Sequence, residues 1–144
     1  GAYQRAVDLH APDLDITCAA CPGFVEFVEA GEVDSPQVRV LAERLLAPIR
    51  AADVDTLVLG CTHYPLLART IGDVMGPDVT LVSSADETAF AVRAMIEQGA
   101  IEAAAVGRRS RHRFVTSGDA TTFAQLGARF LGPEVVRVET WPWT

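Results

Sequence analysis

The stretch "GCTHYP" places a thiol, a hydroxyl and an imidazole in direct succession, at Cys61, Thr62 and His63. A thiolate acts as a base or a nucleophile, and an imidazole holds or relays a proton near neutral pH. The Thr62 hydroxyl can cap a helix or hydrogen-bond an anionic group. These residue types in one run predict a proton-transfer site. The structural alternative is a packed cysteine followed by a capping threonine.

The segments on either side of this run indicate how it is positioned. Residues 55–60 are continuously apolar after the first two, which predicts a strand buried on both faces of a parallel sheet. A helix is expected over 65–75, so Cys61 lies where a strand ends and a helix begins. Ligands of open α/β sheets bind at such strand ends. Gly60 would let a ligand approach the backbone, and the amide groups of the helix N-terminus would favour the thiolate form of Cys61.

The rest of the chain alternates strand and helix patterns, which predicts an α/β fold with an open, mostly parallel sheet flanked by helices. Ser35 followed by Pro36 marks a helix start, Asp119 marks another, and Gly99 marks a helix end. The expected helices are residues 1–10, 35–53, 84–99 and 119–132, and the further strands are 14–21, 79–83, 112–118 and 134–140.

Composition narrows the class of protein. The 144 residues are 49% hydrophobic and carry a net charge of -7, which argues against a nucleic-acid surface. No apolar run reaches the roughly 18–20 residues of a membrane span, and no secretory signal is recognised, so a cytoplasmic location is expected. The one basic cluster, Arg108, Arg109, Arg111 and Arg113, is interpreted as a solvated loop.

Four segments together resemble glutamate racemase, the cofactor-independent enzyme that supplies D-glutamate for peptidoglycan. "LVLGCTHYPLL" is similar to the family's second catalytic-cysteine motif, and "ACPGFVEFVEAGE" resembles its upstream block. "VTLVSSADETA" and "FVTSGDATTFAQLGARFLG" resemble the segments that follow, so the resemblance spans nearly the whole chain.

The resemblance implies a mechanism in which two thiols act on opposite faces of the α-carbon of glutamate. It implies that Cys61 is one of these thiols and that His63 assists proton transfer at it. Thr62 would bind the backbone groups of the substrate. Glu29 matches the family's acidic residue that pairs with the histidine, although on pattern alone it is equally one of several exposed carboxylates.

The family's Cys-Asn-Thr and Asp-Ser-Gly blocks do not occur in this sequence. Residues 1–83 are therefore expected to supply most of the second α/β domain of a two-domain racemase, with the Cys-Thr-His site. Residues 84–144 are expected to be the return segment that completes the first domain, whose N-terminal core is absent. The chain alone is expected to be inactive and to need the missing half, or a second copy as a homodimer, to cover its apolar faces.

Three alternatives remain open at this point. Cys18 and Cys21 with Cys61 and His63 would give four zinc ligands, but Cys18 falls inside an apolar strand pattern, so no metal is expected. The site could belong to a related cysteine racemase for aspartate or hydantoins, or to a maleate isomerase. The chain could also be a non-catalytic, racemase-derived binding module. Trp141 and Trp143 suggest either an interface or a tail folded back on the domain.

Overall fold

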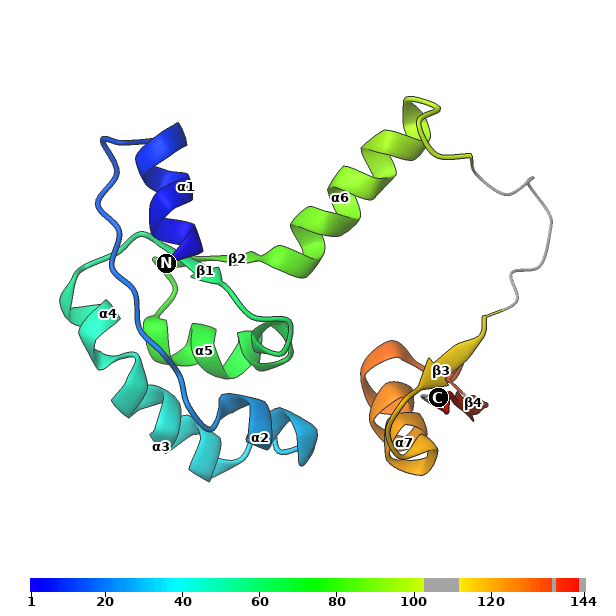
Figure 1. Cartoon of the computed structure of the whole chain (residues 1–144). Coiled ribbons are helices and arrows are strands. Elements are labelled where there is room, and N and C mark those ends of the chain that lie inside the picture. Colours follow the sequence, from blue (N-terminus) through cyan, green and yellow to red (C-terminus); the bar gives the residue numbers. More distant parts are fainter. Residues whose placement is uncertain (103–111, 136, 143–144) are drawn as a thin grey trace. The chain divides into compact units, whose positions relative to one another are not determined.

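The computed structural model describes residues 1–102, 112–135 and 137–142 (Figure 1). The chain divides into two compact units, residues 1–28 with 32–84 and residues 29–31 with 85–144. In chain order the described helices are α1 (Ala2–His10), α2 (Phe24–Glu29), α3 (Pro36–Leu45), α4 (Ala47–Ala51), the 3-10 helix η1 (Tyr64–Leu67), α5 (Ala68–Met75), α6 (Ser84–Glu97) and α7 (Ala120–Leu131). The strands are β1 (Thr56–Leu59), β2 (Thr80–Ser83), β3 (Phe114–Thr116) and β4 (Val138–Thr140).

The first unit is built on a parallel strand pair. β1 pairs with β2 in a register that sets Leu57 beside Leu81 and Leu59 beside Ser83. Parallel strands need a crossover connection, and η1 with α5 provides it. The second unit repeats this plan, since β3 pairs in parallel with β4 and α7 connects them. The predicted α/β class with parallel strands is confirmed.

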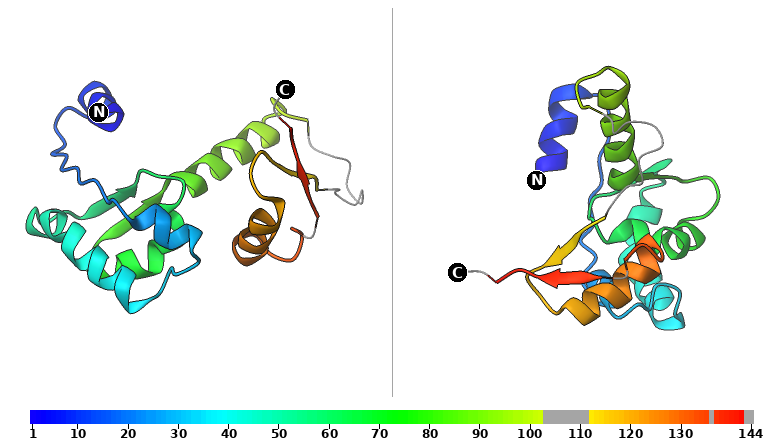
Figure 2. Two further views of the ribbon diagram at one scale, coloured as in Figure 1. Left: turned by 60° about the horizontal axis from the view of Figure 1, so that its bottom comes forward. Right: turned by 90° about the vertical axis from the view of Figure 1, so that its right-hand side faces the viewer.

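The core of the first unit lies among its helices. α3 and α5 pack side by side, as Figures 1 and 2 show. The residues that are nearly inaccessible to solvent are Phe24 and Val28 of α2, Val38 and Ala42 of α3, Leu46, Ile49, Leu59, Leu67 and Ile71. This apolar cluster holds the helices against the strand that leads to the Cys-Thr-His run.

Local signals placed the helix ends correctly. Ser35 caps α3 by accepting a hydrogen bond from the Val38 amide at 3.3 Å, and Pro36 follows it. Asp119 caps α7 in the same way, with the Thr122 amide at 2.6 Å. Gly99 has a φ of 74° just after α6, as a helix-terminating glycine should.

Two predicted helices differ in detail from the observed ones. The helix expected over 35–53 is divided into α3 and α4 at Leu46. Pro48 lacks an amide hydrogen and its ring crowds the carbonyl of the preceding turn, which interrupts a continuous helix. The helix expected over 65–75 begins as η1, where the Leu66 amide donates to the His63 carbonyl at 3.0 Å, and becomes α-helical only at Ala68.

The prediction that 55–60 is buried on both faces is wrong. Leu59 is only 2% exposed, but Val58, on the opposite face, is 49% exposed. In the described residues β1 has a single neighbouring strand, and its face that carries Val58 is only partly covered. β1 is therefore more apolar than its exposure in the first unit requires. Such a sequence is typical of a strand whose two faces are both covered by other elements.

The strand predicted over 14–21 is also not formed. Residues 12–20 are exposed and have no regular secondary structure, and they form no ladder with β1 or β2. A strand is stabilised only by hydrogen bonds to a neighbour, and the described part of the chain offers none here.

Some predictions concern residues outside the described ranges. Arg108, Arg109, Arg111 and Trp143 belong to this group. Trp141 is described. Its amide donates to the Thr116 carbonyl at 2.7 Å, so the backbone here follows β3, while its side chain is 53% exposed. None of the helices in the described ranges is long and apolar enough to cross a membrane.

Thr70 provides a test of the helix packing. Its side chain is 7% exposed, and its hydroxyl donates to the Val33 carbonyl at 2.8 Å, which ties α5 to the chain before α3. We expect Thr70→Val to lower the free energy of unfolding by about 1–3 kcal/mol, because the carbonyl loses its partner. Urea denaturation measures the change. Thr70→Ser, which keeps the hydroxyl, should lose clearly less, and equal losses in the two variants would contradict this role.

Candidate active site

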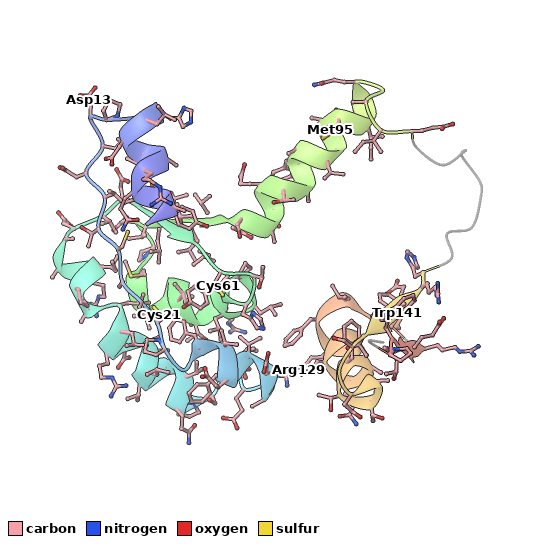
Figure 3. All side chains as sticks on the ribbon, viewed as in Figure 1. Asp13, Cys21, Cys61, Met95, Arg129 and Trp141 are labelled. Carbon is pink, nitrogen blue, oxygen red and sulfur yellow. The ribbon has the colours of Figure 1, made fainter. Side chains whose placement is uncertain are left out.

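The Cys-Thr-His run forms the turn between β1 and η1. β1 ends at Leu59, and Gly60, Cys61, Thr62 and His63 lead to the first residue of η1, Tyr64. The Cys61 side chain is partly exposed, so the thiol is neither sealed in the core nor fully in solvent (Figure 3). The predicted position of the thiol, just beyond the carboxyl end of a parallel strand, is what the structure shows.

The residues before the thiol are held on two sides. The Ser84 hydroxyl donates to the Leu59 carbonyl at 3.4 Å, which fixes the end of β1. At Gly60 the Tyr3 ring comes so close that an added Cβ would lie 2.9 Å from its Cε2 atom. A side chain at position 60 would require the partly exposed Tyr3 ring to shift, and the expectation that Gly60 lets a ligand approach the backbone stays a prediction.

The Thr62 hydroxyl lies 3.2 Å from Nδ1 of His63. It does not cap the following helix, since η1 has no side-chain cap. A hydrogen bond at Nδ1 restricts the orientation of the imidazole. The capping alternative for Thr62 is thus wrong, and the hydroxyl instead contacts the imidazole next to it.

The helix after the thiol begins later than expected, which changes which backbone amides lie near Cys61 along the chain. The first α-helical residue is Ala68, beyond the whole of η1. A helix dipole acts mainly within its first turn, and the amides nearest to Cys61 along the chain are those of the turn and of η1. The expectation that helix amides favour a thiolate at Cys61 stays a prediction.

Tyr64 is a functional candidate that the sequence analysis missed. Its hydroxyl donates to the Cys21 carbonyl at 3.4 Å, and its ring meets that of Phe24 edge to face, with 5.4 Å between centroids. Burial raises the pKa of Tyr64, and the nearby Cys21 and Cys61 add to this by disfavouring a second negative charge. The sequence feature that could have identified Tyr64 is its position directly after the Cys-Thr-His run.

The other two cysteines lie in different environments. Cys21 is buried, and this burial raises its pKa, so its thiol stays protonated more readily than a free one. Cys18 is exposed, and its sulfur accepts a hydrogen bond from Nε2 of Gln4 at 3.0 Å. Within the described ranges no three His, Cys, Asp or Glu side chains are grouped as metal ligands, so the four zinc ligands considered above are not assembled.

Glu29 is the last residue of α2 and is exposed. α2 begins beside the site, because Phe24, its first residue, is the ring that contacts Tyr64. The pairing of Glu29 with His63 stays a prediction. The structure thus brings together Cys61, Thr62 and His63 on one turn and adds Tyr64 to them.

Sequence comparisons identify close relatives over most of the chain. No protein-family model matches it. A glutamate racemase of Beutenbergia cavernae is 53% identical over 142 residues, covering 93% of this chain and 48% of the relative. A glutamate racemase of Mycobacterium leprae is 51% identical, covering 96% of this chain and 50% of the relative. The chain spans about half the length of the curated relatives it matches.

Solved structures lead to the same family. A crystal structure of glutamate racemase isoform RacE1 from Bacillus anthracis matches with a TM-score of 0.85 and 33% identity, covering 99% of this chain and 52% of that one. A glutamate racemase from Thermus thermophilus matches with a TM-score of 0.74 and 34% identity, with 95% and 52% covered. The chain therefore belongs to the glutamate racemase family and represents about half of its usual length.

Proposed function

We propose that the protein to which this chain belongs interconverts L- and D-glutamate, and that this chain supplies one of the two thiols. The observation that carries the proposal is the turn after β1, where Cys61 is partly exposed beside the hydrogen-bonded Thr62 and His63. The similarity of the chain to glutamate racemases supports the choice of substrate.

The chemistry requires a base on one face of the α-carbon and an acid on the other. In one direction the Cys61 thiolate removes the α-proton and leaves a carbanion, and a thiol opposite donates its proton to the other face. In the other direction the roles exchange, so no net oxidation occurs and no cofactor is needed. His63 would hold or return a proton at Cys61, and Thr62 would bind the substrate's amino or carboxylate group, which lowers the cost of the carbanion.

The second thiol would come from the missing N-terminal half, because neither Cys18 nor Cys21 lies in a suitable setting. α6 supports the idea of a further polypeptide. It has no buried residue, although it carries four large apolar side chains that are 38% to 60% exposed, namely Phe90, Val92, Met95 and Ile96. Helices of this kind are normally covered by other protein. We take the missing half as the cover and a second copy, as a homodimer, as the alternative.

The assignment of residues 1–83 and 84–144 to the second and first domains of a racemase belongs to the same proposal. So do the role of the protein in supplying D-glutamate for peptidoglycan, and hence for cell shape, its cytoplasmic location, and the pairing of Glu29 with His63. Within the described residues β2 is the single strand partner of β1, which is consistent with the idea that further polypeptide completes this sheet.

The decisive test compares this chain alone, the full-length gene product, and this chain mixed with the upstream half. Interconversion is followed by the change in optical rotation of L-glutamate and then of D-glutamate. We expect turnover by the full-length protein and none by the chain alone, since one face of the α-carbon then has no base. Interconversion at full rate by the chain alone would overturn the two-thiol division.

Comparing the turnover of several substrates distinguishes glutamate racemase from the alternative functions. Replacing L-glutamate by L-aspartate, a hydantoin or maleate in the same assay tests the related cysteine enzymes, and faster turnover of any of these would contradict the proposal. No turnover of any substrate by the full-length protein would favour a non-catalytic binding module.

A further inference from the structure

Tyr64 is attached to a segment far from it in sequence. Its hydroxyl bonds to the carbonyl of Cys21, 43 residues earlier. Its ring rests on Phe24, with an interplanar angle of 81°, and Phe24 is itself 1% exposed. One side chain therefore has both a polar and an apolar contact with the same short segment, and that segment is anchored in the core.

The other end of the site is anchored separately. The Leu59 backbone pairs with that of Ser83, and the Leu59 carbonyl also accepts the Ser84 hydroxyl. Only Gly60, Cys61, Thr62 and His63 lie between this anchor and Tyr64. Fixing both ends of so short a turn leaves few backbone conformations for the thiol and the imidazole.

We propose that Tyr64 is a positioning residue for the racemase reaction: by holding the Cys21–Phe24 segment it sets where Cys61 and His63 point. The proposal rests on the proposed function. Tyr64 touches no reacting atom and acts through the turn. Because its pKa is raised, its hydroxyl stays a donor to Cys21 while a thiolate forms at Cys61. The contact therefore persists through the proton transfers.

The test uses Tyr64→Phe, which removes the hydroxyl and keeps the ring on Phe24. In the full-length enzyme we expect kcat to fall about tenfold, with KM changed by less than about twofold, because misplacement of the reacting groups affects the transition state more than binding. Thr80→Val is the control. It removes an exposed hydroxyl at the start of β2 that has no hydrogen bond among the described residues, and its kcat should remain near that of the wild type.

A second measurement needs no activity. In the full-length protein, labelled with nitrogen-15, Tyr64→Phe should shift or broaden the ring resonances of His63, while Thr80→Val should change them less. An unaltered kcat with unaltered His63 resonances would show that Tyr64 does not position the turn. A raised KM with kcat unchanged would also contradict the proposal, since it indicates a binding role.

These measurements distinguish a failure of the proposed racemase function from a failure of the proposed role of Tyr64. If the wild-type enzyme does not turn over glutamate, the proposed function fails, and the His63 resonances still decide the role of Tyr64. If Tyr64→Phe does not fold, as judged by circular dichroism, Phe24→Leu replaces it. That variant loosens the Tyr64 ring from the other side and should also lower kcat without raising KM, whereas an unchanged kcat would contradict the proposal.

Discussion

Replacing Cys61 with alanine in the full-length enzyme is expected to abolish glutamate racemisation, with a loss in kcat of about 10²–10⁴-fold or more. The thiol lies on the turn after β1 beside the Thr62–His63 hydrogen bond, and no other thiol of the chain is similarly placed. Without it, one face of the α-carbon has neither a base nor an acid. Optical rotation with L- and D-glutamate as separate substrates measures the loss in both directions.

Cys18→Ala is the matched control, because it removes an exposed thiol whose hydrogen bond, among the described residues, is to the partly exposed Gln4. It should keep kcat within about twofold of the wild-type value, as surface changes usually have small effects. Exchange of the α-proton in deuterium oxide gives a finer readout. The Cys61 variant can retain slow exchange of one enantiomer through the opposite thiol, but not interconversion. Racemisation at the wild-type rate by this variant would remove Cys61 from the mechanism.

The largest effect on stability is expected at Phe24. Its ring is 1% exposed and supports both the core of the first unit and Tyr64. Truncation to alanine should cost about 3–5 kcal/mol of unfolding free energy, because it removes buried area and leaves a cavity that the short α2 cannot fill. A small domain has a total stability of only about 5–15 kcal/mol, so the variant should be unfolded in part near 37 °C. Urea denaturation followed by circular dichroism measures the loss.

Phe90→Ala on α6 provides the control for ring size. Phe90 is 60% exposed in this chain, so its loss should change the unfolding free energy by no more than about 0.5 kcal/mol. Similar losses for the two phenylalanines would mean that Phe24 does not anchor the core. In the full-length protein, by contrast, Phe90→Ala should become costly if the missing half covers α6.

The parts of the fold that depend on neighbouring residues in sequence were predictable. Ser35 with Pro36, Asp119 and Gly99 mark helix ends because capping involves residues within a few positions of each other. The thiol at the end of β1 followed from the same kind of local pattern. The strand over 14–21 and the two-sided burial of β1 were wrong, because both depend on neighbours that the described residues do not include.

The site itself was predictable in composition and less so in geometry. Cys61, Thr62 and His63 were identified from their residue types, but the contact of Thr62 with Nδ1 was not, since its hydroxyl had two equally reasonable partners. The role of Tyr64 depends on a contact across 43 residues, and sequence spacing gives no information about such a contact. The contact of the Tyr3 ring with Gly60 could not be predicted from the sequence for the same reason.

The strand pairing has a consequence for handling the protein. Within the described residues β1 and β2 pair only with each other, and so do β3 and β4, which leaves the outer backbone of each pair open to hydrogen bonding. Open strand edges recruit strands from other molecules and promote aggregation. Solutions of this chain alone should therefore become turbid as they are concentrated. If the proposed N-terminal half pairs with these strands, coexpression with it should keep the chain dispersed.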